Sequence, residues 1–395
     1  MRARLALALA TAVAVLGAAS GVAEPRNSPD ASSLRASLKA DLYGYLSAQQ
    51  MAEHISAVSL AVAFRGRGPS INLAVGSTRY GDGRPISLTN LWQIGSNTKA
   101  FTAVMVLQLE AEHKLSINDR LGKWLPQYPA WRRITIKQLL NMTSGIQDSL
   151  VQPAYLRAYA ANPNQVFSGK RLVSYVAGLP RKPGWVYSNT NYVLAQMIIE
   201  RVTHDSYADQ LRRRIIIPLG LHNMFPGAPR YSRAVISRLP AGYYYISPQA
   251  LPQLSSQFAT DQSRYPVSAP ASGGIVSSPA DVTKWARALF TGRELPRKQQ
   301  RELESLISTK TGEPIQNTTL ADPGGFGLGV EQTTDPTLGT VWAYEGATLG
   351  FRFLLIYLPR SGITIAIGVN SLPEHDNLGL LAKSVYETLH KAGVS

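Results

Sequence analysis

The residues best suited to chemistry are a serine and a lysine three positions apart, in Ser96-Asn97-Thr98-Lys99. Gly95 precedes them and a strongly apolar run follows, which predicts a core helix from Lys99 to Leu115 with Ser96 at its start. Residues at this spacing share one face of a helix. A buried lysine amine beside a serine hydroxyl can help to activate that hydroxyl as a nucleophile. The alternative is a serine cap with a surface lysine.

Tyr187-Ser188-Asn189 is the second candidate element, and it precedes a predicted helix from Tyr192 to Arg201. A phenol held near a lysine ammonium loses its proton more easily and can act as a general base, while an asparagine amide can hold a substrate carbonyl. The sequence contains no G-x-S-x-G or H-E-x-x-H motif. Its six histidines are scattered, which favours surface or helix-end roles for them.

The composition narrows the possible chemistry. The chain has no cysteine, which excludes disulfides, a thiolate nucleophile and cysteine-based metal centres. Covalent catalysis must therefore use oxygen or nitrogen. With 45% hydrophobic residues, the 395-residue chain falls in the ordinary globular range, which excludes collagen, coiled coil and wholesale disorder.

The net charge of +15 is compatible with several anionic partners. Lysine and arginine are scattered, apart from Arg212-Arg213-Arg214, and no nucleic-acid-binding motif accompanies them. We therefore expect no nucleic acid partner. An anionic cell-wall polymer is a candidate partner, and a basic periplasmic surface is the simpler interpretation.

The N-terminus has the features of a secretory signal peptide. Residues 1–23 contain Arg2 and Arg4, then an apolar stretch shorter than the ~20 residues that span a bilayer, then small residues up to Ala23. We expect cleavage after Ala23 and a periplasmic or secreted product. Residues 24–32 are typical of a linker, and no later run resembles a transmembrane span.

Hydrophobic periodicity predicts strands near both ends of the chain and helices between them. One sheet built from both termini follows from this pattern. A capping box at Thr135 to Gln138 and a serine cap at Ser278 mark two helix starts in between, the second helix ending near Gly292. The predicted elements are a helix over 33–53, strands over 57–64 and 71–77, a hairpin over 351–358 and 363–369, and a helix over 378–391.

In order and spacing, the Ser96 and Tyr187 motifs and Leu139–Gly145 between them resemble the penicillin-recognising serine hydrolases, the class C β-lactamase, DD-peptidase and esterase branch. The resemblance spans nearly the whole mature chain, and includes segments 217–221, 271–274 and 327–330. It implies a two-lobed α/β (α+β) fold of the β-lactamase/transpeptidase type over residues 33–395. An antiparallel sheet with flanking helices would occupy about 33–114 and 272–395. A mostly helical lobe would occupy about 115–271.

The same resemblance implies the roles of the site residues. Ser96 would attack a carbonyl to form an acyl-enzyme, and Tyr187, coupled to Lys99, would take and return the proton. The backbone N–H groups of Ser96 and Ala347 would form the oxyanion hole. Asn189 would bind substrate, and no metal or cofactor would be needed.

The third motif of that family is a K-T-G or H-x-G on the strand beside the nucleophile. A literal Lys310-Thr311-Gly312 precedes a polar loop, whereas Tyr344-Glu345-Gly346 leads into the predicted final hairpin. We therefore align Tyr344 with the family's lysine or histidine and place Gly346 beside the substrate. The usual cation, which helps to bind a substrate carboxylate, is then missing.

Arg352 is a candidate replacement for that cation. Alternate residues of a strand face opposite sides, so Arg352 should point away from Phe351 and Phe353. If Phe351 and Phe353 face the core, Arg352 lies near the crevice mouth, where a guanidinium can hold a carboxylate with two hydrogen bonds. A solvated edge-strand charge is the alternative.

Of three possible functions we favour an exported D-alanyl-D-alanine carboxypeptidase-like serine hydrolase, which would act through an acyl-enzyme on cell-wall peptides or β-lactams. A carboxylesterase or amidase of the same fold would suit the missing cation, because its substrates lack a free carboxylate. A non-catalytic penicillin- or wall-binding module is the third alternative, although such a binder has no need for Ser96, Lys99 and Tyr187 together.

Overall fold

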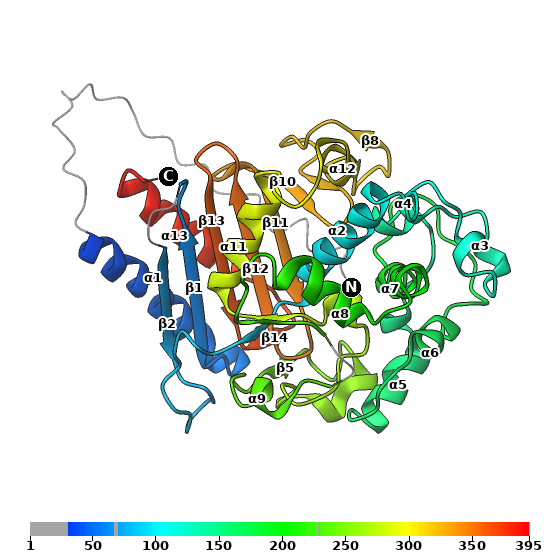
Figure 1. The fold of residues 1–395 in the computed structure, drawn as a ribbon. Helices are drawn as coiled ribbons and strands as arrows, with labels where there is room; N and C mark the ends of the chain where they lie inside the picture. The colour runs from blue at the N-terminus through cyan, green and yellow to red at the C-terminus, as the bar shows by residue number, and fades with distance from the viewer. Residues whose placement is uncertain (1–30, 67–69, 228–229, 395) are drawn as a thin grey trace.

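The computed structural model describes residues 31–66, 70–227 and 230–394 (Figure 1). The predicted signal peptide and residues 24–30 of the predicted linker lie outside these ranges. Helix α1 spans Ala31–Glu53, so the last two residues assigned to the linker are helical. No helix among the described residues is long and apolar enough to cross a membrane.

A nine-stranded antiparallel sheet forms the centre of the fold, and both ends of the chain contribute to it. The predicted early strands are β1 and β2, and the predicted late hairpin is β12 and β13. β1 pairs with β13, with Val58 opposite Val369, which confirms one sheet built from both termini. In sheet order the strands are β2 (Ile71–Gly76), β1 (Ala57–Ala63), β13 (Ile363–Val369), β12 (Arg352–Leu358), β11 (Gly339–Ala347), β10 (Glu331–Asp335), β9 (Gly324–Phe326), β7 (Leu306–Ser308) and β8 (Pro314–Ile315).

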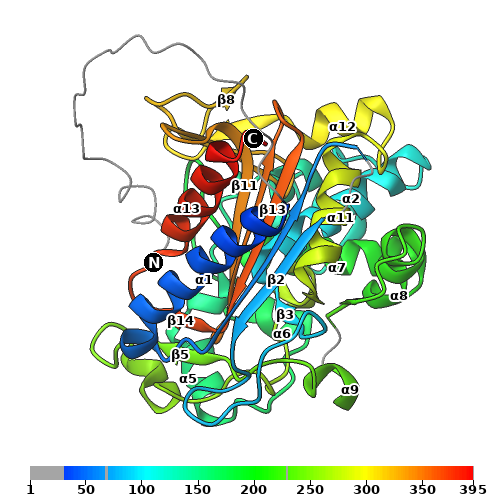
Figure 2. The same ribbon diagram turned by 90° about the vertical axis from the view of Figure 1, so that its left-hand side faces the viewer.

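The first and last helices cover one face of this sheet. α1 and α13 (Leu378–Lys391) lie side by side across it (Figure 2). Their leucines pack on alternate residues of the strands, such as Leu354 and Ile356 of β12. This layer forms a separate apolar core that closes the sheet on the side away from the helical segments.

The opposite face carries α2 (Thr98–Ala111) and α11 (Pro279–Phe290). α2 is apolar on nearly all sides and almost wholly buried, as expected for a helix packed between two layers. It ends before Leu115, because the chain turns at His113, whose φ is +58°. α11 begins at the predicted serine cap, where Ser278 Oγ accepts a hydrogen bond from the N–H of Asp281.

The chain between α2 and α11 consists mainly of short helices around α7 (Asn189–Thr203). The predicted capping box is present, since Thr135 and Gln138 each bond the other's backbone N–H. The lobe boundaries near residues 114 and 272 stay predictions. The remaining elements are α3 (Leu121–Trp124), α4 (Ile136–Leu140), α5 (Pro153–Ala161), α6 (Gly169–Ser174), α8 (Tyr207–Leu211), α9 (Arg233–Ile236), α10 (Pro270–Gly273), α12 (Arg297–Leu303), and the short strands β3 (Trp92–Gln93), β4 (Met224–Phe225), β5 (Tyr243–Tyr245), β6 (Val276–Ser277) and β14 (Ser371–Pro373).

Candidate active site

A short 3-10 turn, η2 (Gly95–Asn97), places Ser96 directly before α2. Gly95 has φ of +52°, a left-handed conformation that glycine adopts without strain. Lys99 follows within the first turn of α2 and is fully buried. Its Nζ donates a hydrogen bond to Ser96 Oγ at 3.1 Å. The two side chains therefore meet, as their spacing predicted.

The Lys99 amine has two further acceptors. Its Nζ lies 2.9 Å from Asn189 Oδ1 and 2.9 Å from the carbonyl oxygen of Ser272 in α10. Together with Ser96 Oγ, these three acceptors match the three N–H donors of a lysine ammonium. The amine also lies 4.8 Å from the centre of the Tyr187 ring. The buried lysine thus links α2, α7 and α10 at one point.

Tyr187 lies in the loop before α7, and its hydroxyl is 2.7 Å from Ser96 Oγ. This loop is held from behind by Met142, which follows α4. The Met142 carbonyl accepts a hydrogen bond from Val186 N, and its sulfur accepts one from Ser188 N. The phenol is therefore fixed against the serine, within reach of proton transfer.

Strand β11 passes very close to η2. A Cβ atom added to Gly346 would lie 2.0 Å from the Ile94 carbonyl oxygen and 2.7 Å from Ser96 N. A Cβ atom added to Gly95 would lie 2.6 Å from Ala347 N. Only glycines permit this approach. It places the backbone nitrogens of Ser96 and Ala347 together at the contact between η2 and β11. Two N–H groups in such a place can stabilise a developing oxyanion.

Tyr344, the residue that the sequence alignment matches to the family's cation, is buried on β11 two residues before Gly346. Its hydroxyl donates to the Tyr187 hydroxyl over 3.4 Å. Lys310 is exposed in the turn between β7 and β8, and β9 and β10 separate those strands from β11. The literal Lys-Thr-Gly is therefore not on the strand beside Ser96.

The expectation for Arg352 was wrong. Its side chain does point away from Phe353, but that face of β12 is covered by α1 and α13 rather than open to the crevice. The guanidinium is buried, with Nη2 2.6 Å from Glu53 Oε2 and Nη1 2.8 Å from Asp376 Oδ1. Arg352 thus belongs to a buried ion cluster on the side of the sheet opposite to Ser96.

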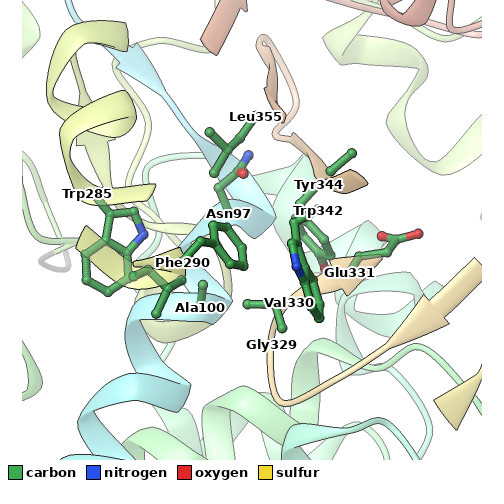
Figure 3. A pocket seen from close by; sticks show the side chains of 12 residues that line it. Asn97, Ala100, Trp285, Phe290, Gly329, Val330, Glu331, Trp342, Tyr344 and Leu355 are labelled. Carbon is green, nitrogen blue, oxygen red and sulfur yellow. The ribbon is translucent and has the colours of Figure 1, made fainter. Parts of the chain in front are cut away.

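A small apolar cavity lies behind Tyr344, between α2, α11 and the strands (Figure 3). Trp285 and Phe290 of α11 face Trp342 and Tyr344 of β11 across it. Ser96 does not line it, so the cavity belongs to the packing that supports the site. Among the described residues, no group of three or more histidine, aspartate or glutamate side chains could hold a metal ion.

A family model described as "Beta-lactamase" matches residues 47–389. The chain belongs to the beta-lactamase family. The matched residues include the whole of the candidate site and all nine strands of the sheet.

Named relatives of this beta-lactamase-family chain include penicillin-binding proteins. It is 27% identical over 282 residues to Penicillin-binding protein 4* of Bacillus subtilis, covering 69% of this chain and 59% of that protein. It is 25% identical over 301 residues to the B. subtilis protein named "Putative penicillin-binding protein PbpX", covering 75% of this chain and 66% of that one. The chain thus spans about three-fifths to two-thirds of these relatives' length.

Solved structures confirm the predicted β-lactamase/transpeptidase-like fold. A D-stereospecific amidohydrolase from Streptomyces sp. is 26% identical, with a TM-score of 0.71 over 93% of this chain and 100% of that chain. A D-amino acid amidase from Ochrobactrum anthropi SV3, complexed with L-phenylalanine, is 23% identical, with a TM-score of 0.76 over 91% and 99% of the two chains. The family and fold are those of serine hydrolases.

Sequence reasoning missed two contacts in this beta-lactamase-family site. Ser272 lies in the segment 271–274 that carried part of the resemblance, but nothing in its type indicated that its carbonyl would accept from Lys99. Asp148, which accepts a hydrogen bond from Asn189 Nδ2 at 2.8 Å, was not among the predicted site residues. Its position three residues after Gly145, at the end of a family-like segment, was the only available signal.

Proposed function

We propose that this protein is a serine hydrolase that acts through an acyl-enzyme, with Ser96 as the nucleophile. The observation that carries the proposal is the pair of contacts at Ser96 Oγ, 2.7 Å from the Tyr187 hydroxyl and 3.1 Å from Lys99 Nζ. A serine needs an adjacent base to attack a carbonyl at useful rates. Here the base and its cationic partner both contact the same oxygen.

The proposed reaction has two halves. Ser96 Oγ bonds to the substrate carbonyl carbon while Tyr187, as the phenolate beside the Lys99 ammonium, takes the serine proton. Tyr187 then gives that proton to the leaving nitrogen or oxygen as the bond to carbon breaks. Water then bonds to the acyl carbon while Tyr187 takes its proton, the bond from that carbon to Ser96 Oγ breaks, and Tyr187 returns the proton to Ser96. The N–H groups of Ser96 and Ala347 hold the oxyanion in both halves.

The substrates we favour are amides or esters of D-configured amino acids without a free carboxylate on the leaving group. Tyr344 supplies a phenol where the family pattern has a cation. Arg352 is ion-paired in a buried cluster on the opposite face of the sheet. A neutral leaving group needs no such cation. The D-stereospecific amidohydrolase that shares this fold over its full length supports the choice of configuration.

A D-alanyl-D-alanine carboxypeptidase is the second candidate, favoured by the relatives named penicillin-binding proteins. Its substrates carry a free carboxylate, so a matched pair of substrates separates the two. We propose to compare a D-Ala-D-Ala peptide with its C-terminal amide and methyl ester. A kcat/KM for the amide or ester at least tenfold above that for the free acid supports the first candidate, and the reverse order supports the second.

The acyl-enzyme itself is tested by intact-protein mass spectrometry with a fluorescent penicillin and an activated ester. The wild type should gain one adduct, and Ser96→Ala should gain none while melting normally. Tyr187→Phe removes one oxygen and should lower turnover about 100-fold or more. An adduct that persists in Ser96→Ala contradicts the proposal. Reversible binding without any adduct in the wild type would identify a non-catalytic binding module.

We also propose export, followed by contact with an anionic wall polymer. Residues 1–23 have the features of a signal peptide, and N-terminal sequencing of the periplasmic or secreted product should begin at Glu24. Residues 115–188, which include the short helices α3 to α6, contain ten lysines and arginines against two aspartates. Such a surface should bind isolated cell-wall polymer in a salt-dependent manner. Retention unaffected by salt contradicts that partner.

A further inference from the structure

Asp148 is a buried carboxylate that is linked to Lys99 through one intervening residue, Asn189. It precedes the 3-10 turn η4 (Ser149–Val151) and is 8% exposed. Its Oδ2 accepts from Asn189 Nδ2 at 2.8 Å, and its Oδ1 accepts from Leu150 N at 3.0 Å. The opposite end of the Asn189 amide, Oδ1, accepts from Lys99 Nζ at 2.9 Å. A continuous chain of hydrogen bonds therefore runs from Asp148 through Asn189 and Lys99 to Ser96.

The two partners of Asn189 fix which way its amide points. A carboxylate only accepts hydrogen bonds, and a lysine ammonium only donates them. A flipped amide would set its NH₂ group against Lys99 and its oxygen against Asp148, so both contacts would become repulsive. In the observed orientation both contacts are satisfied. One N–H of the amide is also left over for a substrate carbonyl.

The segment that carries Asp148 is fastened to the first turn of α7. Ser149 N donates to Thr190 Oγ1 at 2.9 Å, and Thr190 Oγ1 donates to the carbonyl of Gln147 at 2.9 Å. The carboxylate and the Asn189 amide are thus held as one unit. Burial raises the pKa of Asp148, whereas its hydrogen bonds from Leu150 and Asn189 and the charge of Lys99 lower it. Burial prevails, so the pKa of Asp148 lies above its usual value, and this same chain offsets only part of the cost of the buried charge.

We propose that Asp148 is a positioning residue for acylation, which holds the Asn189 amide and, through it, the Lys99 ammonium in line with Ser96. The proposal rests on the acyl-enzyme function proposed above. It assigns Asp148 an effect on the rate of bond formation rather than on substrate affinity. It also requires that Asp148 act only while Asn189 is present.

A double-mutant cycle tests this requirement, with the acylation rate constant at saturating activated ester as the readout. Asp148→Ala should lower that constant about 10-fold or more, since misplacement near the reacting atoms is costly, while the half-saturating concentration changes less than twofold. In the Asn189→Ala background the same change should alter the constant less than twofold. Equal losses in both backgrounds would overturn the proposal, because a general structural role is additive.

Asp148→Asn keeps the shape of the side chain and serves if Asp148→Ala does not fold. Leu150 N and Asn189 Nδ2 donate to different oxygens of Asp148, and in asparagine one of these oxygens becomes an NH₂ group that cannot accept. One of the two contacts is therefore lost, and we expect at least a fivefold loss of the acylation rate constant. A wild-type rate in this variant overturns the proposal.

Asp281→Asn is the matched control. Asp281 lies in the first turn of α11 and also accepts a backbone N–H, from Asn223 at 2.6 Å, and burial likewise raises its pKa. This variant should lose stability yet acylate within twofold of wild type. A fivefold loss of its acylation rate constant would overturn the proposal, because a lower rate would then not report on the placement of Asn189 and Lys99. A wild type that forms no adduct at all overturns the proposed function together with this proposal. Normal acylation of both Asp148 variants overturns this proposal alone.

Discussion

Gly346→Ala should disable acylation while leaving most of the fold intact. The added Cβ would lie 2.0 Å from the Ile94 carbonyl oxygen, where ordinary contact begins at 3.4 Å. β11 and η2 must therefore separate by about 1.4 Å, which withdraws Ala347 N from Ser96 N. Loss of one oxyanion donor typically costs 10²- to 10³-fold in rate, so we expect a loss of about 10²-fold or more in the acylation rate constant.

The assay is the time course of adduct formation with an activated ester, followed by mass spectrometry. Gly379→Ala is the control, because Gly379 lies in α13 with no atom within 4 Å of an added Cβ. That variant should acylate normally and gain up to about 1 kcal/mol of stability, the usual gain for glycine to alanine within a helix. Acylation of Gly346→Ala within threefold of wild type would refute the assignment of this contact as the oxyanion hole.

Three further changes probe the surroundings of the site. Tyr344→His should raise the ratio of kcat/KM for a D-Ala-D-Ala peptide to that for its C-terminal amide by about 10-fold, the scale of one charge-assisted pair. An unchanged ratio in a substrate panel would refute the motif alignment. Lys310→Ala should leave ester turnover within about twofold, as for an exposed side chain, whereas a collapse of turnover would show that its turn takes part. Glu53→Gln should cost about 3 kcal/mol of unfolding free energy in urea denaturation, because it removes one of the two carboxylates that form ion pairs with the buried Arg352 guanidinium. A loss under 1 kcal/mol would show that this ion pair does not stabilise the fold.

The core of the candidate site was predictable because its parts are local patterns. Ser96 and Lys99 lie within one helical turn, and the apolar residues after them indicated a buried helix whose end shifted by only a few residues. Tyr187 was found through its short motif and its position before a helix. The contact between the two motifs depends on long-range packing, which only the family resemblance indicated.

The face that Arg352 occupies could not be predicted in the same way. Strand alternation correctly separated Arg352 from Phe353, but it does not say which side of a sheet faces a crevice and which side lies under helices. That depends on where α1 and α13 pack, and they contact the sheet from opposite ends of the chain. Asp148 was missed for a related reason, because an aspartate in a loop has no pattern of its own.

The pairing of β1 with β13 has a consequence for the order in which the molecule can be completed during synthesis. The Asn370 side chain accepts from Ala57 N, and Arg352 contacts Glu53, across 313 and 299 positions of the chain. When synthesis has reached Ser96 and Lys99, the chain still lacks β11, the covering helix α13, and β13, which is the second neighbour of β1 in the sheet. Such long-range closure is slow to form and leaves hydrophobic strands exposed until the C-terminal hairpin arrives. Ser96, the proposed nucleophile, is therefore made early, but the proposed oxyanion donor Ala347 reaches it only when most of the chain has been synthesised.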